Sequence, residues 1–185
     1  MRGKCILILG GVRSGKSQLA QDMASRLGGP VLFVATGEAQ DEEMRQRIEA
    51  HRKARPSTWR TVEAPVGVGP RVREHIGGAR IVIVDCLTLL VSNVIGRCGD
   101  PGQLDAGLVS QKVAAEIEEL AECIGEVEAT FTLVSNEVGM GLVPDNRLGR
   151  IYRDCLGKAN RELAQRADAV YFMVAGIPMT VKGDS

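Results

Sequence analysis

The sequence predicts an α/β fold in which helices flank a mostly parallel central sheet, and three observations support this. Short apolar runs alternate along the chain with longer amphipathic stretches. A glycine-rich loop lies between the first apolar run and the first amphipathic stretch, as in a strand–loop–helix unit. The length of 185 residues and the 44% hydrophobic content suit one well-buried domain, which we expect to span residues 1–185. Strands joined through helices pair in parallel with right-handed crossovers.

The expected strands are apolar runs bounded by turn-forming residues. They cover residues 5–9, 31–36, 58–63, 80–85, 130–135 and 169–176. The expected helices carry apolar residues at helical spacing. They cover residues 17–27, 38–54, 87–95, about 105–125 and 146–167. The glycine-rich stretch 96–103 is interpreted as a surface loop and not as a domain boundary, because no shift in composition follows it.

Composition excludes several classes of protein. Lysine plus arginine and aspartate plus glutamate both total 23, which favours a small-molecule partner over nucleic acid or a membrane surface. The five cysteines are scattered and none has C-x-x-C spacing, which indicates a reducing cytoplasm and no disulfide framework. The apolar start KCILILG is too short for a signal peptide, and no apolar run reaches the roughly 18 residues of a membrane span.

The strongest motif is GGVRSGKS at residues 10–17, which satisfies the pattern G-x-x-x-x-G-K-[ST]. Its glycines let the backbone curl so that N–H groups point at phosphate oxygens, while Lys16 reaches the β- and γ-phosphates and the Ser17 hydroxyl suits Mg²⁺. Because the motif joins an apolar strand to an amphipathic helix, the sequence predicts a P-loop NTPase-like fold. The expected phosphate-binding residues are Gly10, Gly11, Val12, Arg13, Ser14, Gly15, Lys16 and Ser17.

Such a site needs an acidic side chain at the end of a neighbouring strand, which holds Mg²⁺ directly or through water. The apolar run 80–85 ends in Asp85. An aspartate in this place serves either as the metal partner or as the N-cap of the next helix. With the phosphate loop already placed we favour the metal role, so the predicted metal residues are Ser17 and Asp85.

His51 is one of two histidines and lies in a basic stretch of the expected helix 38–54. Arg47 and Arg55 are one turn away on either side. One interpretation is a solvated surface histidine. The other is a nucleophile, because cationic neighbours favour a neutral ring that can attack a nucleotide phosphorus. The helix C-terminus favours the charged ring instead, so the residues alone leave both interpretations open.

Four segments together resemble the bifunctional adenosylcobinamide kinase/adenosylcobinamide-phosphate guanylyltransferase family of cobalamin synthesis. They lie at residues 10–17, 34–65, 82–93 and 133–182, so the resemblance extends over nearly the whole length of the chain. The resemblance is most specific in HRKARPSTWRTVE and in SNEVGMGLVPDNRL, which do not belong to phosphate-loop proteins in general.

The resemblance implies two phosphorus chemistries. In the first, a hydroxyl of adenosylcobinamide takes the γ-phosphate of ATP or GTP, held with Mg²⁺ on the phosphate loop. In the second, the histidine at the position of His51 attacks the α-phosphate of GTP, expels pyrophosphate and carries GMP. The phosphate of adenosylcobinamide phosphate then takes the GMP to give adenosylcobinamide-GDP. The expected catalytic residues are therefore His51 and Lys16, and the family also implies a homotrimer.

By the same resemblance, nucleotide binding extends beyond the phosphate loop. The further residues are Ala35, Thr36, Gly37, Arg52, Lys53, Ala54, Arg55, Glu63 and Asp85. Three positions depart from the family. Asp85 stands where glutamate is familiar, which alters the distance to a metal, and Gly37 stands where serine is common, which removes a hydroxyl. Ala50 replaces a histidine found in some relatives, which leaves His51 as the candidate nucleophile. Without the resemblance, Glu63 is interpreted as a surface acid.

The segment NEVGMGLVPDNRLGR has two interpretations that the residues leave open. In one, Asn136 and Glu137 orient substrate or metal-bound water and the loop closes over a bulky corrinoid. In the other, the segment is only a helix-entry loop with Asp145 or Asn146 as its cap.

Two other classes of function also remain open. A monofunctional small-molecule kinase would use the phosphate loop without a covalent histidine. A non-catalytic GTP-responsive regulator would bind nucleotide without turnover, but the chain has no N-K-x-D motif for reading guanine. Guanine specificity is therefore implied only by the resemblance.

Overall fold

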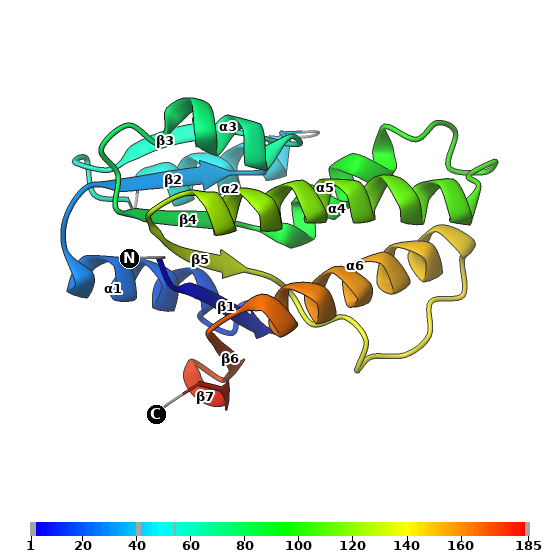
Figure 1. Cartoon of the computed structure of the whole chain (residues 1–185). Helices are drawn as coiled ribbons and strands as arrows, with labels where there is room; N and C mark the ends of the chain where they lie inside the picture. The colour runs from blue at the N-terminus through cyan, green and yellow to red at the C-terminus, as the bar shows by residue number, and fades with distance from the viewer. Residues whose placement is uncertain (1–2, 40–41, 54, 184–185) are drawn as a thin grey trace.

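The computed structural model describes residues 3–39, 42–53 and 55–183. Within these residues one sheet of seven strands has the order β3-β2-β4-β5-β1-β6-β7 (Figure 1). The α/β class with a mostly parallel sheet is confirmed. The strands are β1 (Cys5–Gly10), β2 (Val31–Ala35), β3 (Arg60–Glu63), β4 (Ile81–Asp85), β5 (Thr130–Val134), β6 (Ala169–Val174) and β7 (Ile177–Lys182).

The helices that alternate with these strands lie close to the expected positions, with one addition. They are α1 (Lys16–Leu27), α2 (Glu42–Lys53), α3 (Val68–His75), α4 (Leu87–Gly96), α5 (Ala106–Glu126) and α6 (Arg147–Arg166). None of the helices in the described ranges is long and apolar enough to cross a membrane.

Helix α3 was not predicted, because its glycine and proline residues resemble a loop. Gly67 occupies the left-handed region ahead of the helix, and Pro70 lies in the first turn, where a missing N–H costs nothing. The cap comes from another element: the Glu116 carboxylate of α5 accepts hydrogen bonds from the backbone N–H groups of Gly67 and Val68 at 3.0 and 2.9 Å. Short-range sequence signals cannot reveal a cap of this kind.

The second addition is β7, which pairs antiparallel with β6 beyond the strand that was expected to be the last. Ala175 and Gly176 connect the two strands with φ angles of 51° and 84°, the left-handed values that a two-residue hairpin requires. Alanine seldom adopts this conformation, and Pro178 lies inside the new strand. Because of these two features, the hairpin was not predicted from the sequence.

The strands alternate their side chains between two apolar layers. On β2, Leu32 and Val34 face a large cluster formed with α3, α4, α5 and α6. Val31 and Phe33 face a smaller cluster formed with α1. Figure 1 shows α5 and α6 running alongside each other, with α1 on the other side of the sheet. The six parallel strands all end at one edge of the sheet, where α/β proteins bind ligands.

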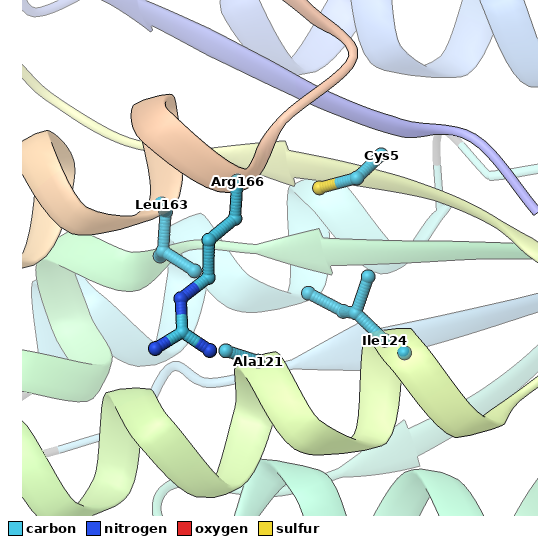
Figure 2. A pocket seen from close by; sticks show the side chains of 6 residues that line it. Cys5, Ala121, Ile124, Leu163 and Arg166 are labelled. Carbon is cyan, nitrogen blue, oxygen red and sulfur yellow. The ribbon is translucent and has the colours of Figure 1, made fainter.

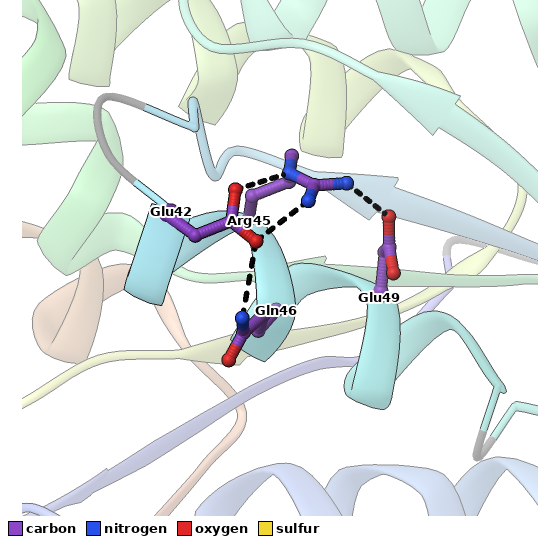
Figure 3. A network of polar contacts seen from close by, with 4 residues as sticks. All are labelled: Glu42, Arg45, Gln46 and Glu49. Carbon is purple, nitrogen blue, oxygen red and sulfur yellow. Dashed lines mark hydrogen bonds and ion pairs between the residues drawn. The ribbon is translucent and has the colours of Figure 1, made fainter.

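Helix α2 carries a network of ion pairs and a hydrogen bond between its own side chains (Figure 3). Arg45 contacts Glu42 at 2.6 Å and Glu49 at 3.1 Å, and Gln46 donates to Glu42 at 3.0 Å. These partners are three or four positions apart, so they stabilise the helix locally. They are exposed and do not attach α2 to the sheet.

Candidate active site

The segment 10–17 forms a phosphate-binding loop between β1 and α1, as expected. Gly10 approaches its neighbours so closely that a Cβ atom would lie 2.7 Å from the Met173 carbonyl oxygen. Gly15 has a φ of 96° just before the helix begins, a value that favours glycine. The first turn of α1 holds no acidic residue, and its N-cap makes no side-chain hydrogen bond. The N–H groups of this end are thus available to an anion.

Two contacts hold the loop from outside. The Glu137 backbone N–H donates to the Gly10 carbonyl at 3.1 Å, and the Gly176 N–H donates to the Ser14 carbonyl at 3.1 Å. The segment after β5 and the β6–β7 turn therefore support the phosphate loop. The unexpected hairpin thus has a direct part in shaping the site.

Lys16 is buried, with 7% of its surface exposed. Its Nζ donates to the Gly11 carbonyl at 2.6 Å and lies 3.5 Å from the Ser14 hydroxyl. Burial lowers the pKa of the Lys16 ammonium below its ordinary value, and the nearby Cys86 and Asp85 oppose this shift. The ammonium is held inside the loop, so a phosphate that bound there would supply the missing counter-charge.

The ends of β2 and β4 are joined by one buried hydroxyl. Thr36 is fully buried, and its Oγ1 accepts from the Cys86 N–H and donates to the Cys86 carbonyl, both at 2.7 Å. The Thr36 carbonyl accepts from the Asn93 side chain of α4, which also donates to the Pro65 carbonyl. This network fixes the backbone on either side of Asp85.

A cavity of about 350 Å³ opens at this edge of the sheet beside the phosphate loop. It brings together elements that are far apart in the chain: the loop, the ends of β2 and β4, and parts of α2 and α4. Its lining includes residues of the predicted phosphate loop, of the further predicted nucleotide-binding set and of the predicted metal pair. The lining residues are Val12, Ser17, Ala35, Gly37, Ile48, Arg55, Asp85, Cys86, Thr88, Leu89 and Asn136.

Other predicted residues do not line this cavity. Thr36 lies beneath it, with its side chain engaged by Cys86. Glu63 is exposed at the end of β3, although its charge acts on Arg55. Arg52 and Lys53 are exposed on α2. Arg13 is exposed and has a φ of 56°. The other predicted phosphate-loop residues that do not line the cavity form the loop beside it. They are Gly10, Gly11, Ser14, Gly15 and Lys16.

The predicted nucleophile lies on α2, which faces this site through its C-terminal part. The backbone of His51 is helical, and its side chain lies outside the described set. Ala54 lies outside the described residues altogether. Ile48, one turn before His51 on α2, and Arg55, two residues beyond the end of α2, both line the cavity. The helix that carries His51 thus borders the candidate nucleotide site.

Gly37 has a steric reason to be glycine in this chain. A Cβ atom at this position would lie 3.3 Å from Cδ1 of Ile48 and 3.6 Å from Cδ1 of Leu89. The first distance is tighter than an ordinary contact, so a serine here would require the Ile48 side chain to shift by a few tenths of an ångström. The departure from serine therefore accompanies close packing of α2 against the site.

Ser17 and Asp85 satisfy the requirements of a magnesium site of the phosphate-loop type. A hydroxyl and a carboxylate line the same cavity, and both are oxygen ligands. The described residues contain no group of three or more His, Cys, Asp or Glu side chains that would form an all-protein metal site. Mg²⁺ usually keeps several waters and takes its other ligands from substrate phosphates, so two protein ligands suffice.

Cys86 is the other potential nucleophile in the cavity wall. Burial raises the pKa of its thiol from the ordinary 9.0 to about 11, and the charge of Asp85 adds to this shift. A thiol with such a pKa is protonated at neutral pH, and the thiolate is the nucleophilic form. Cys86 is therefore unsuited to attack a phosphorus atom.

A second hollow of about 500 Å³ lies at the opposite edge of the sheet (Figure 2). It is lined by Cys5 at the start of β1 and by Arg166 at the end of α6. The Arg166 guanidinium already pairs with Glu118 at 2.5 Å and Glu162 at 3.2 Å. Its remaining described lining is mostly apolar, so it offers no phosphate-binding groups beyond this engaged arginine.

Sequence reasoning missed several residues of the site. Cys86, Thr88, Leu89 and Ile48 line the cavity, yet none belongs to a motif of known chemistry. Phe33, which lies against Arg55, and Trp59, which stacks on Phe33, were interpreted only as parts of strands. Their positions follow from tertiary packing, although an aromatic residue next to a basic cluster is a signal that could have suggested Trp59.

The fold and the geometry of the loop place this chain among the P-loop nucleotide-binding α/β proteins. More narrowly, the chain belongs to the family described as cobinamide kinase / cobinamide phosphate guanyltransferase, which it matches over residues 6–181. The resemblance seen in the sequence is thereby confirmed.

Three curated relatives have names that agree with this assignment. The chain is 44% identical over 178 residues to the bifunctional adenosylcobalamin biosynthesis protein CobP of Pseudomonas aeruginosa, covering 96% of this chain and 97% of that protein. It is 39% and 37% identical over 180 residues to the bifunctional adenosylcobalamin biosynthesis proteins CobU of Escherichia coli and Salmonella typhimurium. Each of these two alignments covers 96% of this chain and 99% of the relative.

Proposed function

We propose that this protein phosphorylates adenosylcobinamide with ATP or GTP and then transfers GMP from GTP to adenosylcobinamide phosphate. The product is adenosylcobinamide-GDP, an intermediate of cobalamin biosynthesis. A single domain spanning residues 1–185 carries both activities. Family membership supports the reaction class, and the names of the relatives support the pathway.

The observation that carries the proposal is the cavity in which Ser17, Asp85 and Arg55 converge beside the phosphate loop, with the His51 helix at its border. A γ-phosphate on the loop would meet Lys16, and an anionic nucleotide would meet Arg55. Both cations are partly or fully buried and lack a paired carboxylate within salt-bridge distance among the described residues. This arrangement suits a polyphosphate ligand.

In the kinase step, the hydroxyl oxygen of adenosylcobinamide attacks the γ-phosphorus, and the bond from that phosphorus to the bridging oxygen breaks. The nucleoside diphosphate leaves, and the hydroxyl proton is released. Lys16 and the N–H groups of the loop take up charge on the phosphate oxygens. Bound Mg²⁺, held by Ser17 and Asp85, would neutralise charge on the β- and γ-phosphates.

In the nucleotidyl step, an imidazole nitrogen of His51 attacks the α-phosphorus of GTP, and pyrophosphate leaves. A phosphate oxygen of adenosylcobinamide phosphate then attacks the same phosphorus, and the phosphorus–nitrogen bond breaks to restore the imidazole. Arg55 lies four residues after His51 in the chain, just beyond the end of α2, and takes up charge on the phosphate. Ping-pong kinetics are the expected mark of such covalent catalysis.

We further propose that the protein works as a homotrimer in the cytoplasm. Cys86, Cys98, Cys123 and Cys155 form no disulfide among the described residues, which supports a reducing compartment. Support for self-association comes from β7, an edge strand on which Ile177, Met179 and Val181 are 67%, 56% and 67% exposed. These three side chains share one face of the strand, and exposed apolar rows on edge strands favour pairing. Sedimentation velocity tests this, because a monomer at micromolar concentration would contradict it.

The test of the two activities is to measure them separately in the wild type and in His51→Ala. One assay follows transfer of the γ-phosphate to adenosylcobinamide, and the other follows formation of adenosylcobinamide-GDP from supplied adenosylcobinamide phosphate. We expect the variant to retain the first and lose the second by at least about 1000-fold, as for loss of a covalent nucleophile. His75→Ala, which removes the other histidine, should change neither. Equal effects of His51→Ala on both activities would contradict the division of roles.

A further inference from the structure

The proposed activity accounts for a cation at Arg55, but it does not explain the aromatic surroundings of this side chain. Its guanidinium lines the cavity and lies over the ring of Phe33, with Cζ 3.7 Å from the ring centroid. Its Nε is buried and has no hydrogen-bond partner among the described residues. A buried donor without a partner costs free energy, which a ligand oxygen would recover.

Two aromatic side chains from different elements meet at this point. Phe33, on β2, is 1% exposed, and the ring of Trp59 stacks on it with centroids 6.5 Å apart and planes 22° from parallel. A turn brings Trp59 back toward the sheet, because its N–H donates to the Pro56 carbonyl at 3.0 Å. The chain has only three phenylalanines, one tryptophan and two tyrosines, so two of its few aromatic residues are gathered beside one arginine.

The charges around Arg55 do not fix its position. Asp85 and Glu63 attract it and Arg52 repels it, while burial lowers the pKa of the guanidinium. No salt bridge to either carboxylate is formed within the described part of the chain. The direct hold on the guanidinium is therefore the aromatic ring beneath it.

We propose that Phe33 and Trp59 are positioning residues that hold the Arg55 guanidinium at the mouth of the cavity, where its free Nε–H binds a phosphate oxygen of the nucleotide. This inference rests on the proposed nucleotide site. It adds a specific role for two residues that line no part of the cavity. Because Arg55 follows the helix that carries His51, the same stack also attaches the end of α2 to β2.

The proposal is tested by calorimetric titration of GTP in EDTA, which removes Mg²⁺ so that binding is measured without either transfer. A second ligand is inorganic tripolyphosphate, which has no base or sugar. Loss of a cation–π contact of this kind is expected to raise Kd by about 2- to 30-fold. We expect Phe33→Leu and Trp59→Leu to weaken both ligands by factors in this range, and Trp59→Phe, which keeps an aromatic ring, to restore most of the affinity.

A double-mutant cycle separates positioning from general loss of structure. In the Arg55→Ala background, Trp59→Leu should have no further effect on the Kd of either ligand, because the group it positions is gone. Phe131→Leu is the matched control, since Phe131 is as deeply buried as Phe33 but lies in the other apolar cluster. It should leave both Kd values unchanged.

Three results would overturn the proposal. One is wild-type affinity in Phe33→Leu and Trp59→Leu. Another is an additive effect of Trp59→Leu in the Arg55→Ala background, which would indicate a purely structural role. The third is weakening for GTP but not for tripolyphosphate, which would assign Arg55 to the base or sugar. These binding measurements do not depend on GMP transfer. The positioning role of Phe33 and Trp59 and the proposed function can therefore fail independently of each other.

Discussion

Lys16 combines burial, a lowered pKa and a place inside the phosphate loop. In Lys16→Met the apolar stem stays and the ammonium is lost. We expect kinase activity to fall by about 100-fold or more, as when a donor that stabilises transition-state charge is removed. The melting temperature should not fall, because the folded state no longer carries a desolvated ammonium. Steady-state kinetics and thermal melts check both statements, and a large drop in melting temperature would contradict the second.

Asp85 is the carboxylate that the proposed magnesium site requires. Asp85→Asn keeps the size and removes the charge, so we expect the Mg²⁺ concentration for half-maximal kinase activity to rise by about 10-fold or more. Asp85→Glu moves the carboxylate outward by one methylene and restores the residue familiar in the family. It should regain much of the affinity for Mg²⁺. An unchanged Mg²⁺ dependence in Asp85→Asn would exclude the metal role and favour the structural one.

Thr36 determines how the ends of β2 and β4 are joined, because its buried hydroxyl makes two hydrogen bonds to the backbone of Cys86. Thr36→Val keeps the shape and leaves the Cys86 N–H and carbonyl without this partner. We expect a loss of about 2–4 kcal/mol in the free energy of unfolding. Urea denaturation measures it. A loss below about 0.5 kcal/mol would show that water replaces the hydroxyl, and would return Thr36 to the candidates for ligand contact.

Sequence reasoning located the elements well where the signal is local. Apolar runs gave β1, β2, β4 and β5 to within about one residue, and the glycine motif placed the phosphate loop. Helix α3 and strand β7 were missed for different reasons. The first is capped by Glu116 from a distant helix, and the second follows a turn with a left-handed alanine.

Within the candidate site, too, local sequence signals predicted some residues and tertiary packing placed the others. Ser17 and Asp85 were predicted from a motif and a strand end, and both line the cavity. The packing of Ile48 against Gly37 and of Arg55 on Phe33 depends on how α2 lies on the sheet. The sequence does not predict that placement. The ion pairs of α2 join residues of the same helix and do not indicate how the helix lies on the sheet.

For the molecule as a unit, two thiols set how stability depends on alkaline pH. Burial raises the pKa of both Cys86 and Cys123 from 9.0 to about 11. Their contribution is fully present below pH 9 and is lost as the pH rises through 11, since the unfolded chain ionises first. At about 1.4 kcal/mol per pH unit for each thiol, we expect the two thiols together to lower the free energy of unfolding by about 5 kcal/mol over this range. Denaturant titrations at several pH values should show a smaller fall in the Cys86→Ala/Cys123→Ala variant, and an equal fall would contradict the assignment.

The claim that separates the two proposed activities is the covalent histidine. The most direct measurement is to mix the protein with Mg²⁺ and GTP labelled at the α-phosphorus, denature it, and look for label on the polypeptide. We expect label that is acid-labile and alkali-stable in the wild type and in His75→Ala, and none in His51→Ala. A wild type that transfers the γ-phosphate but takes up no label would contradict the GMP–His51 intermediate and leave a phosphate-loop kinase.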